Sequence, residues 1–181
     1  MNRFPSVIRI LLTPLLGLIV LTLSGCISNA LPPQMRHQNA ITQTGAAMAY
    51  KLAAAAHWGK DASNQLIMVS PPLIYGPDAE AKHAPVHSGQ LRNALVYGLL
   101  HLEHAPHVVA WAPQSSDGLE SNQWLLQARM FNRMPIRLAH KTLYPYRLEM
   151  RFYHPGQRPL SLETHGTFDS DELKVDNTNQ D

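Results

Sequence analysis

The chain has a single cysteine, and its position limits what the thiol can do. Cys26 lies at the end of an apolar N-terminal stretch, directly after Ser24 and Gly25. A thiolate is a nucleophile and a soft metal ligand, but one thiol cannot close an intramolecular disulfide. The small residues before Cys26 leave room for another enzyme to modify the sulfur and cut the chain. This pattern therefore predicts a modification site rather than a redox, metal or catalytic cysteine.

Residues 1–25 have the layout of an export signal. Arg3 and Arg9 give a positively charged start, and the apolar stretch from Ile10 to Leu23 follows. At roughly 14 residues this stretch is shorter than the about 20 that a membrane-spanning helix needs. The sequence therefore predicts a signal peptide that is removed from the mature protein.

The end of this signal, LSGC at Leu23–Cys26, resembles the lipobox of bacterial lipoproteins. The resemblance implies cleavage between Gly25 and Cys26, attachment of a diacylglyceryl group to the sulfur, and acylation of the new amine. Two or three acyl chains anchor a protein stably, whereas one chain alone holds only marginally. The alternative is an unmodified cysteine, buried at the end of a transmembrane anchor.

The residues after the cysteine bear on where the protein is sorted. Ile27 and Ser28 follow Cys26, with no aspartate among them. By resemblance to bacterial sorting rules this favours the outer membrane over the inner membrane. We therefore expect a protein that is lipid-anchored in the outer membrane, with its folded part facing the periplasm.

Composition excludes some classes of partner. Two of the 15 basic residues lie in the signal, so the mature chain has 13 basic against 13 acidic residues. A nucleic-acid-binding protein needs a basic face, and zero formal net charge argues against one. The mature length suits about one domain. We expect a tether over residues 26–39, a folded domain over 40–168 and a disordered acidic tail over 169–181.

Hydrophobic spacing predicts two helices. An alanine-rich helix begins at Ala40 and ends near Gly59, and a second helix begins after Ser88, its expected N-cap. Short apolar runs and period-two alternation predict strands over 66–69, 107–112, 124–130, 146–153 and 160–166. This order predicts an α/β (α+β) sandwich, with two helices packed on a mostly antiparallel four- to five-stranded sheet.

Five segments carry a resemblance to known envelope lipoproteins. They are QLIMVSPPL, SGQLRNALVYGLLHL, HVVAWAP, QWLLQARMF and YRLEMRFYHPGQRPLSLETHG, within residues 45–168. Their order is similar to that of the LpoB-type lipoproteins, which activate a bifunctional penicillin-binding protein. More distantly it resembles the CsgG and FlgO lipoproteins of outer-membrane assemblies. The first resemblance implies a regulator of a peptidoglycan synthase, and the second a structural or assembly component.

The chain departs from the LpoB pattern in two ways. Those proteins usually carry one or two helices before the final strands, where this chain has the loop 113–121. They also have a long proline-rich tether. Here about 14 residues separate Cys26 from the first helix, and fully extended they reach about 50 Å. The short tether favours a partner close to the outer membrane.

The chain has ten histidines, which raises the question of a metal site. His101, His104 and His107 are three apart, and side chains at that spacing on one helix can bind one ion. Pro106 breaks that helix, however, and no HExxH motif is present. A metal-binding or small-ligand lipoprotein would need the histidines to converge. We expect no metal, and no cofactor beyond the lipid on Cys26.

The sequence contains no motif that predicts an enzyme. GxSxG, SxxK, Walker and GxGxxG patterns are all absent from the chain. The acidic pairs Asp78 with Glu80 and Asp169 with Asp171 lie in polar segments that are typical of solvated surface. We therefore expect a binding protein without catalytic activity.

An interaction surface is predicted on the solvent-facing side of the last strands. Alternate residues of Tyr146–Tyr153, YRLEMRFY, face the core, so the others share the opposite face. Tyrosine and arginine are enriched in binding hot spots. If Tyr144 and Tyr153 lie on this face beside Arg147 and Arg151, the four form an aromatic–arginine surface; the alternative is that these aromatic side chains belong to the core. The expected occupant is a periplasmic or outer-membrane protein such as a penicillin-binding protein, and not a nucleic acid.

Overall fold

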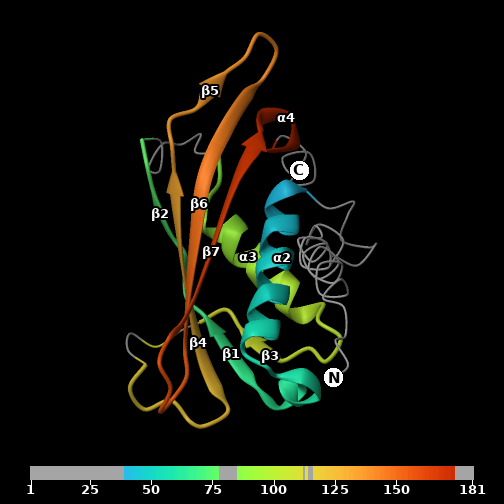
Figure 1. The fold of residues 1–181 in the computed structure, drawn as a ribbon, viewed down its shortest axis with the longest axis vertical. Helices are drawn as coiled ribbons and strands as arrows, with labels where there is room; N and C mark the ends of the chain where they lie inside the picture. Colours follow the sequence, from blue (N-terminus) through green and yellow to red (C-terminus); the bar gives the residue numbers. More distant parts are fainter. Residues whose placement is uncertain (1–38, 78–84, 112, 114–115, 174–181) are drawn as a thin grey trace, which may run out of the picture. The chain divides into compact units, whose positions relative to one another are not determined.

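The computed structural model describes residues 39–77, 85–111, 113 and 116–173. Gly25, Cys26, the predicted signal peptide and the tether up to residue 38 lie outside this part of the chain. Within it, two long helices lie on one face of a seven-stranded mixed sheet (Figure 1). The predicted α+β class is confirmed, with more strands than expected. None of the helices in these residues is long and apolar enough to cross a membrane.

The first helix, α2 (Ala40–Ala55), begins where the sequence predicts. The side chain of Asn39 caps it by accepting a hydrogen bond from the N–H of Thr42 at 2.7 Å. The helix ends at Ala55, before the expected end at Gly59. His57 takes a positive φ of 54° just after it, and the 3-10 helix η4 (Gly59–Asn64) follows.

The second helix, α3 (Ser88–Leu100), begins one residue earlier than predicted, because Ser88 was expected to be the N-cap and is the first residue of the helix. His87, not Ser88, is the N-cap, and the side chain of Gln90 accepts a hydrogen bond from its N–H at 3.0 Å. The Ser88 hydroxyl instead donates to the carbonyl of Pro72 at 2.7 Å. The serine therefore ties the start of α3 to the segment between two strands.

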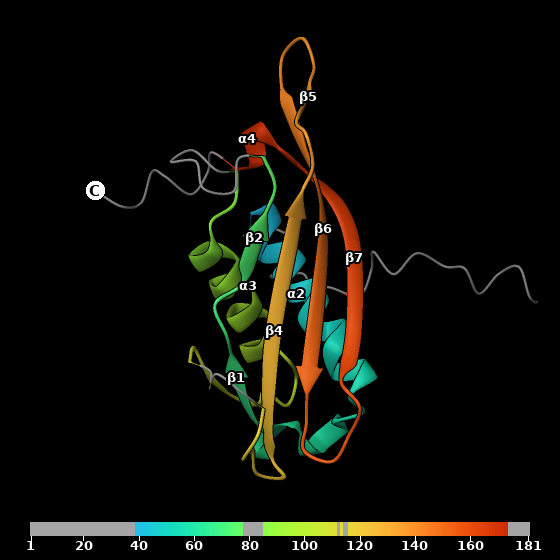
Figure 2. The same ribbon diagram turned by 90° about the vertical axis from the view of Figure 1, so that its left-hand side faces the viewer.

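The strands of the sheet pair in two different ways, parallel in one part and antiparallel in the other. In chain order they are β1 (Leu66–Val69), β2 (Leu73–Tyr75), β3 (His107–Val109), β4 (Gln123–Asn132), β5 (Ile136–Arg137), β6 (Thr142–Tyr153) and β7 (Leu160–Asp169). β1 lies parallel to both β3 and β4, and β2 continues parallel along β4. β4, β6 and β7 form an antiparallel meander, and β5 pairs with the start of β6 (Figure 2).

Several boundaries differ from the prediction. The strands β2 and β5 were not predicted, because they are only three and two residues long and most of their side chains are exposed. β3 ends at Val109, short of the expected end. β7 runs on to Asp169, and the short helix α4 (Ser170–Leu173) follows it. The expected disordered tail over 169–181 therefore begins with five ordered residues, and 174–181 lie outside the described part.

The core lies between the helices and one face of the sheet. Even-numbered residues of β4 and β6 point into it, as the alternation predicts: Trp124, Leu126, Ala128, Met130, Tyr146, Leu148, Met150 and Phe152 are all buried. They pack against α2 and α3 through Met48, Leu52, Leu91, Leu95 and Leu99. The indole of Trp124 stacks on Phe152 with ring centres 4.6 Å apart, and Trp58 meets both edge-on.

Polar contacts tie the helices to the sheet at both ends. Arg92 of α3 donates from Nε and Nη2 to the carbonyl of Val69, at 3.1 and 3.0 Å. The Tyr146 hydroxyl lies 3.1 Å from the Thr44 hydroxyl of α2. Burial raises the pKa of Tyr146, so this phenol stays protonated and available for the hydrogen bond. Its ring stacks on Phe168 of β7 at 4.3 Å.

The two helices touch through glycine. A Cβ on Gly45 of α2 would lie 2.5 Å from the carbonyl oxygen of Ala94 in α3, and a Cβ on Gly98 would lie 2.6 Å from the Cα of Ala46. Because these neighbours are backbone atoms, neither can turn aside. The contact between α2 and α3 therefore requires residues without a side chain at both positions.

We expect Gly98→Ala to lower the free energy of unfolding by about 1–3 kcal/mol, since the new methyl group pushes the helices apart. Gly89→Ala in the first turn of α3 is the matched control, because no atom lies within 4 Å of its new Cβ. That change should raise stability by about 0.5–1 kcal/mol, the ordinary helix preference for alanine. Urea unfolding measures both, and equal effects would contradict the close helix contact.

Candidate interaction surface

The face of the sheet opposite the helices carries the predicted interaction residues. Odd-numbered side chains of β4, β6 and β7 lie on it, and the register places them in cross-strand rows. One row contains Gln127, Arg151 and Ser161, the next Arg129, Glu149 and Glu163, and the third Phe131, Arg147 and His165. β2 extends the last two rows with Leu73 and Tyr75, which are 51% and 43% exposed.

Three side chains of the third row form an aromatic–arginine cluster, made of Tyr75, Phe131 and Arg147. The rings of Tyr75 and Phe131 stack with centres 5.1 Å apart and planes 15° from parallel. The guanidinium carbon of Arg147 lies 4.5 Å from the centre of the Phe131 ring. Cations over an aromatic face are held by the ring quadrupole. The guanidinium group of Arg147 is thus held against a pair of stacked aromatic rings on the open face of the sheet.

Charged neighbours orient the cluster. Arg147 Nη2 donates to Glu149 Oε1 at 2.9 Å, and these side chains are 36% and 26% exposed. On β7, Glu163 and His165 pair at 2.7 Å and are more exposed. Arg129 and Arg151 add two cations to the same face. Three arginines against two glutamates give the face a small positive balance, and histidine adds to it when protonated.

The predicted residues divide between the two faces of the sheet. Arg147, Arg151 and Tyr153 are odd-numbered and lie on the open face, as expected. Tyr144 is even-numbered and packs against the core beside Phe168, so its inclusion was wrong. Strand β6 is regular through this region, and residues two apart share a face.

The three correctly placed residues do not form one compact group. Arg147 and Arg151 are four residues apart on β6, which is about 13 Å along the strand. Tyr153 lies further on, beside Leu125, which is buried on this face together with Met68. The face is therefore buried around Leu125 and Met68, whereas Arg151 and Ser161 on the next row, and Leu73 and Tyr75 on β2, are exposed.

Sequence reasoning missed two members of the aromatic–arginine cluster. The alternation in QWLLQARMF places Phe131 on the same side as Gln127 and Arg129, so the signal for it was present. Tyr75 carried no such signal, because it lies on the unpredicted strand β2. Only its parallel pairing with Phe131 reveals the contact.

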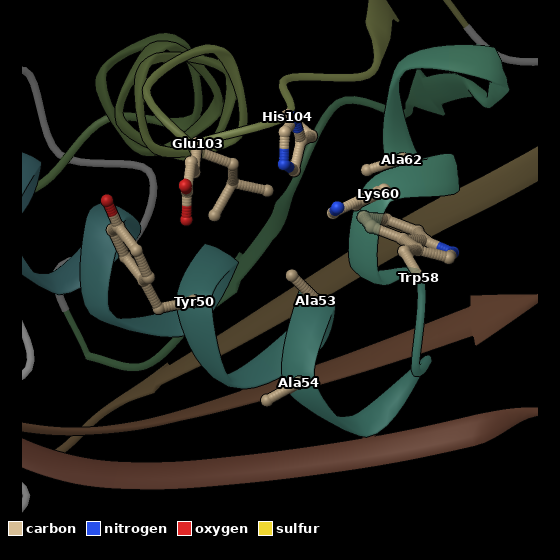
Figure 3. Close-up of a pocket in the computed structure, with 9 residues that line it drawn as sticks. Tyr50, Ala53, Ala54, Trp58, Lys60, Ala62, Glu103 and His104 are labelled. Atoms are coloured by element: carbon tan, nitrogen blue, oxygen red, sulfur yellow. The ribbon is translucent and has the colours of Figure 1, made fainter.

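A pocket of about 480 Å³ lies on the helix side, between α2, η4 and the segment after α3 (Figure 3). Its wall is mainly apolar, with Trp58 and three alanines, and Lys60, Glu103 and His104 also line it. The Tyr50 hydroxyl donates to the carbonyl of His101 at 3.1 Å. Burial, and then the nearby Glu103, raise the pKa of Tyr50. Figure 3 shows the indole nitrogen of Trp58 pointing away from the other lining residues.

The histidines that the structure describes do not gather around this pocket. Only His104 lines it, whereas His101 stacks on Tyr97 and His107 begins β3. His154 lies against Trp124 instead, with ring centres 4.1 Å apart and planes tilted by 43°. Across the described ranges, no three His, Cys, Asp or Glu side chains lie close enough to hold a metal ion.

Comparisons with known proteins give distant likenesses. No family model matches the chain, and no curated protein matches its sequence. The lipoprotein GNA1162 from Neisseria meningitidis has 14% identity and a TM-score of 0.38, over 59% of this chain and 85% of that structure. A Helicobacter pylori protein assigned as a homolog of neuraminyllactose-binding hemagglutinin has 11% identity and a TM-score of 0.34, over 59% and 67%. At TM-scores below 0.5 neither likeness carries an argument.

We expect Phe131 and Arg147 to be energetically coupled. A double-mutant cycle with Phe131→Leu and Arg147→Met should give a coupling energy of about 0.5–1 kcal/mol in urea unfolding, as for exposed cation–aromatic pairs. Arg151→Met is the matched control on the same strand face. Because it lies more than 10 Å away, its effect should add to that of Phe131→Leu within about 0.5 kcal/mol. If the effect of Arg147→Met also adds to that of Phe131→Leu, as the effect of Arg151→Met should, the contact between Arg147 and the Phe131 ring is contradicted.

Proposed function

We propose that this chain is an outer-membrane lipoprotein, anchored through Cys26, whose periplasmic head binds another envelope protein. The observation that carries the proposal is the aromatic–arginine cluster of Tyr75, Phe131 and Arg147 on the uncovered face of the sheet. The anchor rests on the lipobox resemblance at Leu23–Cys26.

The cluster has the properties of a protein-binding hot spot. Such sites combine arginine and tyrosine, which supply contact area and directional hydrogen bonds in one patch. Here stacking and the ion pair to Glu149 already hold Arg147, so binding orders fewer free side chains. Neither a nucleophile–base pair nor a cofactor takes part in this function, and the proposal assigns none to the chain.

The partner we place first is a peptidoglycan synthase, which the head would regulate in the manner of the LpoB-type lipoproteins. This choice rests on the resemblance of the element order. The second candidate is assembly of an outer-membrane complex, in the manner of FlgO or CsgG. The short tether favours the second, because about 14 extended residues span at most about 50 Å from the membrane.

Cys26→Ser should abolish anchoring. We expect the variant to leave the membrane fraction of intact cells and to lack the mass of the acyl groups, because the hydroxyl is not a substrate for the thiol chemistry. Ile27→Asp is the matched change at the next residue, and it should keep the lipid but move the protein to the inner membrane. Fractionation and mass spectrometry measure both. A Cys26→Ser protein that still carries the mass of the acyl groups would contradict the anchor.

The partner should be captured from the open sheet face. We expect a photo-crosslinking residue at Glu163 to form an adduct in intact cells, and one at Asn93, exposed on the helix side, to form none. Adding Arg147→Glu and Arg151→Glu should reduce the Glu163 adduct several-fold, since it reverses the charge of the face.

The mass of the captured protein separates the two candidates. A penicillin-binding protein would support synthase regulation, and outer-membrane proteins would support assembly. Equal labelling from Glu163 and Asn93, or an adduct that the arginine changes leave intact, would contradict binding through this face.

A further inference from the structure

The turn between β4 and β6 projects past the helices, with β5 on one side of it (Figures 1 and 2). It exposes large apolar side chains in a short run: Met134 is 71% exposed, Ile136 51% and Leu138 46%. Exposed apolar side chains grouped in this way mark a contact with a protein or a membrane. We call residues Arg133–Leu138 the hairpin tip.

The tip is also cationic. Between Phe131 and Leu148 the sequence has no acidic residue. Arg133 and Arg137 are exposed, and neither forms an ion pair within the residues that the structure describes. Apolar side chains flanked by arginines match the interface of a bilayer with anionic headgroups, where apolar groups insert and guanidinium groups meet phosphate.

Acidic side chains lie at the base of the hairpin and not in the hairpin tip. Lys141 Nζ lies 2.8 Å from Asp169 Oδ2 at the end of β7. The backbone N–H of Asp171, and after it the ammonium of Lys141, hold the pKa of Asp169 below its ordinary value. The N–H of Thr142 donates to Ser170 Oγ at 3.2 Å. These contacts fix the base to α4, whereas Arg133 and Arg137 form no ion pair with any described residue.

The described part of the chain begins at the same end of the head. Helix α2 begins at Ala40 beside β7 and α4, where Thr44 meets Tyr146, and its first turn lies at the hairpin end of the sheet (Figure 1). The segment that leads to Cys26 therefore starts from the end of the head that carries the tip. An anchor on Cys26 brings this end toward the bilayer.

We propose that the hairpin tip inserts into the headgroup interface of the anionic bilayer that holds the acyl chains of Cys26. This inference rests on the anchor of the proposed function, because the anchor identifies the occupant as a bilayer. Met134, Ile136 and Leu138 enter the boundary with the acyl chains, and the two arginines bind phosphate groups. The acyl chains and the tip together fix the orientation of the head.

The test uses the full lipidated chain in vesicles of phosphatidylethanolamine and phosphatidylglycerol. Met134→Cys carries an environment-sensitive dye, and Cys26 does not react because its sulfur is already bound to the diacylglyceryl group as a thioether. Gln157→Cys is the matched control, in the exposed turn at the opposite end of β6. We expect brominated acyl chains to quench the dye at position 134 at least about twofold and to leave position 157 unchanged.

Arg133→Glu with Arg137→Glu should remove most of the quenching at position 134, and so should vesicles without anionic lipid. Thermal unfolding of these variants should match that of the parent, since the changed side chains are exposed. Equal quenching at 134 and 157 would overturn the proposal. So would a dye at 134 that is shielded only as protein concentration rises, because a second copy would then cover the tip.

The anchor and the tip can fail separately. Lipidated protein whose tip stays in water would overturn the tip contact and leave the proposed function standing. If the parent chain carries no lipid on Cys26, Cys26→Ser keeps the dye on position 134 alone, and quenching of that dye by added vesicles would then overturn the anchor and leave the tip contact standing. Mass spectrometry of the same samples reports the lipid.

Discussion

The head depends on the direct contact between the backbones of α2 and α3 at Gly45 and Gly98. Because no side chain separates the helices there, both fit side by side on one face of the sheet. Leucines of α3 and Met48 and Leu52 of α2 then reach the even-numbered residues of β4 and β6. Among the described elements, no helix packs on the opposite face, and the aromatic–arginine cluster forms there. One tight helix contact thus leaves an open surface on the other side.

The sequence predicts the parts of the fold that repeat a period over many residues. Alternation in β4, β6 and β7 identifies the strands and the buried side of each, and the spacing of leucines identifies α3. Strands β2 and β5 could not be predicted, because three and two residues are too few for a period. β2 forms because it pairs with β4, which is distant in the sequence, and β5 forms because the chain folds back and pairs it with β6. Tyr144 was placed on the wrong face although the alternation assigns it correctly. It lies two residues before Tyr146 and therefore shares the core face with it.

A grouping of arginine with aromatic side chains on this face was predicted in type and only partly in place. Arginine and aromatic side chains do meet on the solvent face of the meander, but the aromatic partners of Arg147 are Phe131, directly opposite on β4, and Tyr75 on β2. Local alternation assigns a residue to a face and says nothing about which residue lies across from it. The register of the strands determines which residues lie opposite each other, and the register follows from the lengths of the turns and the packing of the core. A cluster built across three strands is therefore beyond reasoning from single segments.

The position of the cluster along the sheet constrains which partner can use it. Phe131 lies three residues from Met134, about 10 Å along an extended strand, so the cluster is at the end of the sheet that bears the hairpin tip. If the tip rests in the bilayer, the cluster faces sideways just above the membrane surface. A partner that binds there must itself come close to the outer membrane. A synthase held in the inner membrane would have to extend across the periplasm to meet the cluster, whereas a component of an outer-membrane complex is already beside it. The short tether and the tip thus both favour a partner close to the outer membrane, and both depend on the anchor at Cys26, whereas the resemblance of the element order is the argument for a synthase.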